Sequence, residues 1–372
     1  MIDALGIVSF GNDAIRVEGL MDYRPISAIS FLGRYRMIDF VISNMTNSGI
    51  ENIKVFVKKQ PRSLIEQLGT GRHYNINSKR GGLQILYGET DDMTSGIYNH
   101  DVSAYKANKE FIEDAKQEYV IIAPGYMVYS INFEEVLKAH KESHADVTVV
   151  YKSIDTANEN FFGCTTLELD DAKRITGTAV NMGRYKNRNV SLDTYVMTRK
   201  LFLDLVDEAS RISSLYMFRD ILRDCVEPLN VVGYAYKGYC ACINSLPAYY
   251  NASMELIDHK VAKDLFKPGW PIYTRTNDSV PAYYGEDAKV TNCLIANGCR
   301  IEGELENCVL GRGVTVKKGC KIKNAVILPE TYIGEDTTIE YAVVDKKVVV
   351  KSVKEIKGTE TAPAYIKRRD RI

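Results

Sequence analysis

The stretch that decides the fold is Gly33-Arg-Tyr-Arg-Met-Ile-Asp-Phe-Val-Ile-Ser-Asn-Met-Thr-Asn-Ser-Gly-Ile50. Its apolar residues recur at positions 37, 38, 41, 42 and 45, which is the spacing of one face of a helix. Gly49 stands where a left-handed C-terminal cap belongs, so the pattern predicts a helix over 37–48. Residues 53–57, Ile-Lys-Val-Phe-Val, alternate and are rich in β-branched side chains, which predicts a strand. A helix and a strand joined so closely form half of a βαβ unit.

Further strands and helices alternate along the first 245 residues. We expect strands at 4–10, 82–87, 119–123 and 147–151, with helices over 63–68 and 107–116 and a third helix capped by Asn132. This alternation predicts a doubly wound α/β domain. Ligands bind such sheets at the carboxyl ends of the strands, so a site is expected in the residues that follow 10 and 123.

The C-terminal part of the chain repeats itself. Segments that begin at 292, 307, 324 and 341 share a pattern in which aliphatic residues recur every six positions, as at Leu310, Val316, Ile322 and Leu328. Six residues per face and three faces per coil are typical of a left-handed parallel β-helix. We therefore divide the chain into an α/β domain over 1–245, a connecting helix and linker over 246–287, and a β-helix over 288–372.

Composition narrows the classes of function. The 48 basic and 48 acidic residues cancel, which gives no reason to expect nucleic acid or an anionic membrane as a partner. No apolar run approaches the ~18 residues of a membrane span, and the N-terminal Met-Ile-Asp-Ala-Leu does not resemble a cleavable leader, so we expect a cytoplasmic protein. The eight cysteines lie mostly singly inside apolar runs and are expected to be free thiols.

The stretch from Gly33 to Ile50 resembles the matching segment of glucose-1-phosphate adenylyltransferase (ADP-glucose pyrophosphorylase), and a weaker resemblance extends over nearly the whole chain. It implies a Rossmann-like nucleotidyltransferase domain of the nucleotide-diphospho-sugar transferase type, followed by the left-handed β-helix. The implied reaction converts ATP and glucose 1-phosphate to ADP-glucose and pyrophosphate in glycogen biosynthesis.

This sequence departs from the family's catalytic members where phosphates and metal would bind. Their phosphate loop has closely spaced glycines, because backbone N–H groups converge on a phosphate only where no Cβ intervenes. Their Mg²⁺ is held by two aspartates, and two lysines contact phosphates. The substituted positions here are Asn12 and Ala14 for glycines, Ile26 and Val180 for lysines, and Gly125 and Cys242 for the aspartates.

Nucleotidyl transfer depends almost wholly on positioning and charge neutralisation. We therefore expect this chain to be inactive by itself, with no catalytic residue and no metal site. No cofactor is assigned to it, and Mg²⁺ is expected in a catalytic partner.

Three arginines are candidates for binding an anionic effector. Arg24 and Arg36 fall on positions that resemble a basic cleft where the family binds sugar phosphates or other anions, and Arg312 is a third candidate. The guanidinium fork donates bidentate hydrogen bonds to phosphate. The alternative is that they are solvated or ion-paired residues, because Asp22 and Asp39 are near in sequence.

The resemblance as a whole implies a regulatory, non-catalytic subunit that assembles with a catalytic homologue, as a heterotetramer, and activates or stabilises it. Two alternatives remain open. The chain is an active sugar-phosphate nucleotidyltransferase in its own right, or it is a hexapeptide-repeat acyltransferase. The second alternative lacks the catalytic histidine of that class, since no histidine follows His259.

Overall fold

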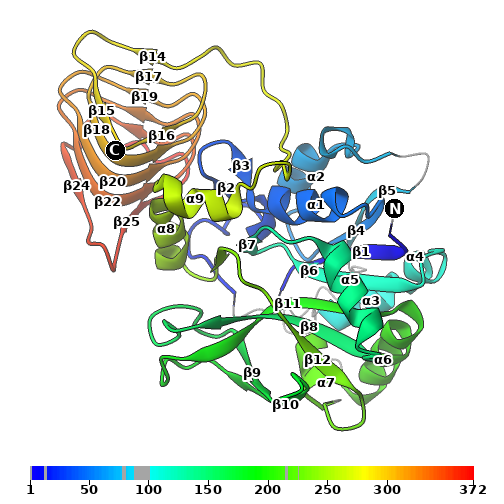
Figure 1. Ribbon diagram of the computed structural model, residues 1–372. Helices are drawn as coiled ribbons and strands as arrows, with labels where there is room; N and C mark the ends of the chain where they lie inside the picture. The colour runs from blue at the N-terminus through cyan, green and yellow to red at the C-terminus, as the bar shows by residue number, and fades with distance from the viewer. Residues whose placement is uncertain (1, 12–14, 78–80, 88–100, 214–216, 225) are drawn as a thin grey trace. The chain divides into compact units, whose positions relative to one another are not determined.

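The computed structural model describes residues 2–11, 15–77, 81–87, 101–213, 217–224 and 226–372 (Figure 1). It divides into two compact units, each of which is discontinuous in sequence. Unit 1 comprises Met1–Ile15, Ile38–Cys242 and Pro268–Tyr273, and unit 2 comprises Arg16–Met37, Ile243–Lys267 and Thr274–Ile372.

Unit 1 is built on a mixed sheet with the strand order β10-β9-β11-β6-β1-β4-β5, in which β8 joins β11 to β12. The neighbours β6, β1, β4 and β5 are parallel, whereas β11 runs antiparallel to β6. These strands are β1 (Ala4–Ser9), β4 (Asn52–Val57), β5 (Gly82–Tyr87), β6 (Tyr119–Pro124), β8 (Val147–Ile154), β9 (Thr165–Leu169), β10 (Ile175–Val180), β11 (Arg188–Thr198) and β12 (Val231–Ala235).

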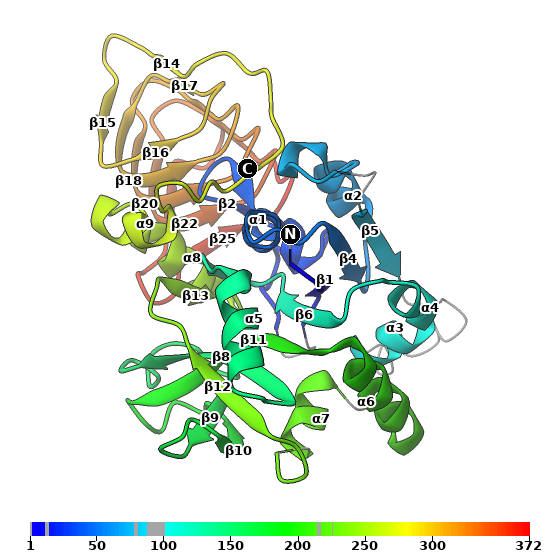
Figure 2. The ribbon, with the colours of Figure 1, turned by 45° about the vertical axis from the view of Figure 1, so that its right-hand side comes forward.

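Helices cover both faces of this sheet, as Figure 2 shows. On one face α1 (Met37–Asn47) packs so closely on β1 that a Cβ at Gly6 would lie 2.8 Å from the sulfur of Met45. The Ser48 hydroxyl links α1 to α5 (Phe133–Glu142) by accepting a hydrogen bond from the Phe133 amide. The opposite face is covered by α3 (Asp101–Ala107), α4 (Lys109–Glu113), α6 (Arg199–Ile212) and α7 (Phe218–Asp224), whose aromatic side chains pack on Leu5 and Ile7.

The joint between α1 and β4 confirms the predicted half of a βαβ unit. Gly49 has a left-handed φ of 81°, and the amides of Gly49 and Ile50 return to the carbonyls of Thr46 and Met45. The helix predicted over 107–116, by contrast, is wrong in its extent. It consists of two short helices, because the side chain of Asn108 donates to the carbonyls of Ala104 and Tyr87 and separates α3 from α4.

Smaller elements complete unit 1. They are α2 (Arg62–Leu68) and an antiparallel pair formed by β7 (Met127–Tyr129) and β13 (Cys240–Cys242). Asn132 caps α5 as predicted, since its side chain accepts a hydrogen bond from the Glu134 amide at 3.0 Å.

Unit 2 is a left-handed parallel β-helix, so the architecture predicted from the repeats is confirmed. One sheet has the order β14-β17-β19-β21-β23, and a second has the order β15-β18-β20-β22-β24 with β16 and β25 paired alongside. Aliphatic side chains stack inside the coils, in ladders such as Ile301, Val316, Ile333 and Val350. The strands are β14 (Tyr283–Tyr284), β15 (Lys289–Thr291), β16 (Leu294–Ile295), β17 (Arg300–Ile301), β18 (Glu304–Leu310), β19 (Thr315–Val316), β20 (Lys321–Ile327), β21 (Tyr332–Ile333), β22 (Thr338–Val344), β23 (Val349–Val350), β24 (Glu355–Lys357) and β25 (Ala364–Ile366).

Two helices and a hairpin belong to the same unit as the β-helix. They are α8 (Leu246–Glu255), α9 (His259–Leu265) and the pair β2 (Ser30–Phe31) with β3 (Tyr35–Arg36). Tyr250 of α8 donates to the carbonyl of Asn324, and Tyr249 donates to the carbonyl of Ser30. Within the described ranges, no helix has the length and apolar character needed to cross a membrane.

Candidate functional site

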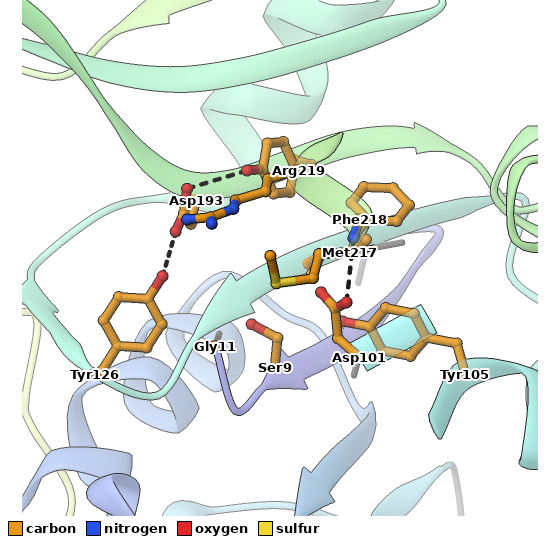
Figure 3. Close-up of a pocket in the computed structure, with 11 residues that line it drawn as sticks. Ser9, Gly11, Asp101, Tyr105, Tyr126, Asp193, Met217, Phe218 and Arg219 are labelled. Atoms are coloured by element: carbon orange, nitrogen blue, oxygen red, sulfur yellow. Dashed lines mark hydrogen bonds between the residues drawn. The ribbon is translucent and has the colours of Figure 1, made fainter. Parts of the chain in front are cut away.

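The place where a nucleotide phosphate would meet the sheet of unit 1 is covered by an aromatic ring. Gly11 follows β1 with a left-handed φ of 79°, and a Cβ at this residue would lie 2.4 Å from the ring of Tyr126. Tyr126 comes directly after β6, where Gly125 donates its amide to the carbonyl of Ser9 at 3.0 Å. The two strand ends are thus joined, and the ring lies against the glycine backbone (Figure 3).

Asp193 on β11 holds the Tyr126 ring in place. The hydroxyl of Tyr126 donates to this carboxylate (Figure 3). The hydroxyl of Tyr195 donates to the other carboxylate oxygen at 3.1 Å. Asp193 has a left-handed φ of 45° at an irregularity of the β11–β8 pairing, which turns its side chain away from the regular strand pattern. Burial raises the pKa of Asp193, while the bonds from both tyrosines and the charge of Arg219 act in the opposite direction.

A second partly buried carboxylate lies in the same region. Asp101 begins α3, and its Oδ1 accepts from the amides of Val102 at 2.9 Å and Phe218 at 3.1 Å. Burial raises the pKa of Asp101 to about 6, with these two hydrogen bonds opposing the shift. Asp101 is therefore held by backbone donors, with no lysine or arginine among its named interactions in the described residues.

The cavity between these groups is small. It measures about 20 Å³, which is room for roughly one water molecule. Small-molecule sites usually occupy about 300–1,000 Å³. In this structure Tyr126, Asp193 and their neighbours fill the space at the ends of β1 and β6.

The structure places the other substituted positions as follows. Gly125 offers only backbone atoms. Cys242 ends β13 as a buried thiol whose Sγ lies 3.4 Å from that of Cys164, and this contact, followed by burial, raises its pKa well above the ordinary value. Val180 ends β10 half exposed, and Ile26 is buried in a short 3-10 helix of unit 2.

Asn12 and Ala14 lie outside the described residues. Among the residues that the structure does describe, no group of three or more His, Cys, Asp and Glu side chains is arranged to hold a metal ion. Neither Gly125 nor Cys242 supplies the anionic oxygen that Mg²⁺ requires, so these two positions do not fit that ion.

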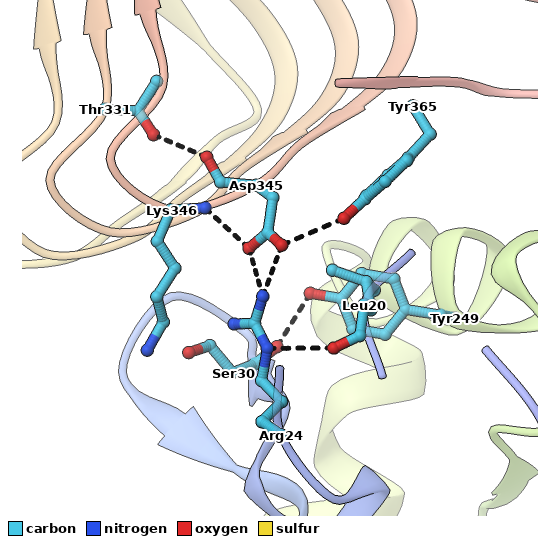
Figure 4. Close-up of polar contacts among 8 residues, drawn as sticks. All are labelled: Leu20, Arg24, Ser30, Tyr249, Thr331, Asp345, Lys346 and Tyr365. Atoms are coloured by element: carbon cyan, nitrogen blue, oxygen red, sulfur yellow. Dashed lines mark hydrogen bonds and ion pairs between the residues drawn. The ribbon is translucent and has the colours of Figure 1, made fainter. Parts of the chain in front are cut away.

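A cluster of charges in unit 2 contains two of the predicted arginines. Arg24 is 3% exposed and forms an ion pair, through Nη2, with both carboxylate oxygens of Asp345, which is completely buried. Asp345 also accepts from the hydroxyl of Tyr365 at 3.0 Å and from the amide of Lys346 at 2.6 Å (Figure 4). The Nε of Arg24 donates to the carbonyl of Leu20 at 2.9 Å.

Further cations surround this pair. Burial, together with the charges of Arg36, Arg24 and Arg368, lowers the pKa of Lys346 to about 8, and the charge of Asp345 acts in the opposite direction. We call Arg24, Arg36, Asp345, Lys346 and Arg368 the Asp345 cluster. It has four cationic side chains around one carboxylate, and the Nη1 atom of Arg24 is buried without a hydrogen-bond partner in the described part of the chain.

Arg312 lies on the same edge of the β-helix, two coils before Lys346. Residues 310, 327 and 344 are paired in register, so Arg312, Pro329 and Lys346 follow at equivalent places in successive coils. Two coils span about 10 Å at the usual strand spacing. Arg312 donates to the carbonyl of Arg275 at 3.2 Å.

Sequence reasoning missed Asp345, Lys346 and Arg368. A signal was present for the first of them, because Asp345 stands where the two preceding coils carry Gly311 and Leu328. A carboxylate at the inner edge of an aliphatic repeat indicates a buried ion pair. Nothing in the local sequence marks Arg368.

Comparison with known proteins agrees with both units. Residues 11–234 match the family described as nucleotidyl transferase, and residues 279–362 match the family described as GlmU-like, C-terminal hexapeptide. The chain is similar to the glycogen biosynthesis protein GlgD of Bacillus subtilis (strain 168), with 32% identity over 98% of this chain and 95% of that protein.

Two further relatives are a second GlgD and a glucose-1-phosphate adenylyltransferase. GlgD of Geobacillus stearothermophilus is 34% identical over 86% of this chain and 82% of its own length. Glucose-1-phosphate adenylyltransferase of Fervidobacterium nodosum is 28% identical over 94% of this chain and 85% of its own length.

Proposed function

Because this chain belongs to the glucose-1-phosphate adenylyltransferase family, and within it to the type represented by GlgD, we propose that it is a regulatory subunit of that enzyme in glycogen biosynthesis. In this proposal the chain has no adenylyltransferase activity by itself. It assembles with a catalytic homologue, as a heterotetramer, and activates or stabilises it.

The observation that carries this proposal is that the ring of Tyr126 lies against Gly11 and is fixed there by the hydrogen bond from its hydroxyl to Asp193. A phosphate bound by the Gly11 backbone would have to displace this buried ring and would then lie beside the Asp193 carboxylate. Charge repulsion and the cost of exposing the ring both oppose this. Catalysis of nucleotidyl transfer needs the opposite environment, with cations and backbone donors aimed at the phosphates.

The substituted metal positions support the same reading. Positions 125 and 242 have no carboxylate to bind Mg²⁺, and without Mg²⁺ the charge of the phosphates is not neutralised. A subunit of this kind acts through its differential contacts with a partner, which shift the partner toward its active conformation. Mg²⁺ then belongs to the catalytic partner.

The test is pyrophosphate release from ATP and glucose 1-phosphate with Mg²⁺. It is measured for this chain alone, for a catalytic homologue from the same cell alone, and for the two together. We expect no release from this chain alone and a faster rate from the mixture than from the homologue. Turnover by this chain alone, at a rate near that of the homologue, would overturn the proposal and favour an active nucleotidyltransferase.

We also propose that the Asp345 cluster, together with Arg312, is the place where an anionic effector acts. The support is the group of four cations near Asp345 and the unsatisfied Nη1 of buried Arg24. In this proposal Arg36, Lys346 and Arg312 contact the effector, and Arg24 stays paired with Asp345. Phosphate and a sugar bisphosphate are the probes.

Calorimetric titration of the full chain at pH 7 is expected to show binding of the bisphosphate that Lys346→Met weakens at least tenfold. Lys347→Met is the matched control, because Lys347 lies next in sequence and pairs with Glu330 at 3.1 Å on the surface. Equal binding by both variants, or no binding by the native chain, would remove the cluster as an effector site.

A further inference from the structure

Two cysteines lie side by side at the first coils of the β-helix. Leu294 and Ile295 of β16 pair in register with Val309 and Leu310 of β18. The residues just before, Cys293 and Cys308, therefore occupy equivalent places in neighbouring coils. The residues directly before the two cysteines are also paired, because the side chain of Asn292 donates to that of Asn307 at 2.7 Å.

The later coils show what this place in the repeat normally holds. Cys308 pairs with Ala325, Ala325 with Ala342, and Ala342 with Ala364. The place thus requires a small side chain, and alanine satisfies that requirement in three coils. Packing explains a small residue here, but it does not explain why adjacent coils carry two thiols.

The geometry meets the conditions for a disulfide. Neighbouring parallel strands lie about 4.8 Å apart, which is inside the range of about 4.4–6.8 Å that Cα atoms of a disulfide span. The two thiols also have the same orientation, because Cys293 donates to the carbonyl of Thr291 at 3.1 Å and Cys308 donates to the equivalent carbonyl of Glu306 at 3.2 Å. Cys308 is completely buried, whereas Cys293 is partly exposed at the end of the stack where an oxidant in solution can reach it.

We propose that Cys293 is a site of oxidation by hydroperoxides and that Cys308 resolves the oxidised form to an intramolecular disulfide between the first two coils. The Cys293 thiolate attacks one oxygen of the peroxide, the O–O bond breaks, and water or an alcohol leaves, so that Cys293 becomes a sulfenic acid. The Cys308 thiol then attacks this sulfur. The S–O bond breaks, the S–S bond forms and water leaves, and two electrons pass from the thiols to the peroxide.

Local electrostatics favour this order of events. The contact with Cys308 lowers the pKa of the Cys293 thiol, and the same contact together with burial raises the pKa of Cys308 well above its ordinary value. The exposed thiol therefore supplies the thiolate that attacks the peroxide, while the buried thiol stays protonated until the sulfenic acid has formed.

A second thiol pair in the molecule provides an internal comparison. Cys164 and Cys242 have their Sγ atoms 3.4 Å apart, but both are buried, at 8% and 7% exposure. The thiols are therefore neighbours in both pairs, but only the pair of Cys293 and Cys308 includes a thiol that solvent can reach. Hydroperoxide is expected to oxidise Cys293 first and to leave Cys164 and Cys242 reduced in the folded chain.

The full chain is treated with hydrogen peroxide, the remaining thiols are blocked with N-ethylmaleimide, and the tryptic peptides are identified by mass spectrometry. Cleavage after Lys289, Arg300 and Arg312 separates the two cysteines, so the expected product is peptide 290–300 joined to peptide 301–312. Fragmentation distinguishes Cys293 from Cys299 within the first peptide. Reduction with dithiothreitol is expected to separate the pair again.

Two variants keep the inference falsifiable. Cys308→Ala places in the second coil the residue that later coils already use, and it is expected to stop at a Cys293 sulfenic acid that dimedone traps. Cys293→Ser is expected to abolish the linked peptide. The inference is overturned if the native chain links Cys164 to Cys242 first, or if Cys293 is still a reduced thiol that N-ethylmaleimide alkylates after peroxide treatment. It is also overturned if Cys308→Ala gives no dimedone adduct.

Discussion

The end of the sheet in unit 1 holds partly buried carboxylates and the Asp345 cluster in unit 2 holds a fully buried one, and the two regions stabilise them differently. Around Asp101 and Asp193 the partners are backbone amides and tyrosine hydroxyls, and burial raises both pKa values. Asp345 is instead held by the guanidinium of Arg24 within a group of four cations.

This difference bears on what each region binds. Asp101 and Asp193 disfavour a phosphate at the end of the sheet, although the charge of Arg219 partly offsets that of Asp193, and this agrees with the proposal that the chain does not bind nucleotide. A cluster in which cations outnumber carboxylates attracts anions even after one internal pair has formed. In our proposal the first region has lost nucleotide binding, whereas the second keeps the ability to bind an anion.

The largest effect is expected from breaking the ion pair in the Asp345 cluster. Asp345→Ala leaves the Arg24 guanidinium buried without its counter-charge and removes the acceptor of the Tyr365 hydroxyl. We expect the free energy of unfolding to fall by about 3–5 kcal/mol, the usual cost of removing one partner of a buried pair. Urea unfolding followed by circular dichroism measures this.

The matched control removes both charges. Arg24→Met combined with Asp345→Leu is expected to recover most of the lost stability, because no uncompensated charge remains. If Asp345→Ala costs less than about 1 kcal/mol, the pair behaves like an exposed ion pair and the comparison between the two regions fails.

The second largest effect is expected at Asp101, where a substitution is expected to increase the stability of the chain. Its folded pKa of about 6 lies above the unfolded value, so its contribution to stability is fully present below about pH 4 and is lost as pH rises through 6. Asp101→Asn keeps an acceptor for the amides of Val102 and Phe218 and removes the ionisation. We expect the variant to be more stable than the native chain by about 2–3 kcal/mol at pH 8 and equal to it at pH 4.

Unfolding curves at the two pH values test this prediction. Asp204→Asn serves as the control, because Asp204 is an exposed carboxylate on α6 that lies near Lys200 at 3.7 Å. This variant is expected to differ little in stability from the native chain, because an exposed ion pair contributes little. A destabilised Asp101→Asn at pH 8 would mean that the ionised carboxylate is favoured in the folded state.

Much of the fold was predictable because its patterns are local. The helix over 37–48, its glycine cap and the following strand appear where the sequence placed them, and so do the coils of the β-helix. Such patterns record which side chains face a core, and they do not depend on distant partners. The break at Asn108 was missed because it depends on a contact with the carbonyl of Tyr87, which belongs to another strand.

The candidate site was predictable only as a set of substitutions. Comparing Gly125 and Cys242 with the family predicts which metal ligands are absent, but it does not predict what occupies the space. That Tyr126 covers Gly11 depends on Asp193, which is 67 residues further along the chain and adopts a left-handed conformation that nothing nearby in the sequence demands. Asp345 likewise pairs with an arginine 321 residues away.

The smallest effect is expected from the hydroxyl that holds the ring over Gly11. Tyr126→Phe keeps the ring and removes one donor to Asp193, while Tyr195 still donates to the other oxygen at 3.1 Å. We expect the free energy of unfolding to fall by about 1.5–2 kcal/mol at pH 8, the lower part of the usual range for one hydrogen bond to a charged group, because the second tyrosine donor remains. The loss should shrink as pH falls and Asp193 takes up a proton, because a neutral carboxyl depends less on donors.

Tyr195→Phe is the matched control for this prediction, since it removes the other tyrosine donor from the same carboxylate but leaves the ring over Gly11 untouched. Both variants are expected to share the pH dependence, and neither is expected to bind ATP with Mg²⁺ in equilibrium dialysis. Magnesium-dependent ATP binding by Tyr126→Phe alone would mean that the hydroxyl, rather than the missing cations and metal ligands, keeps nucleotide out.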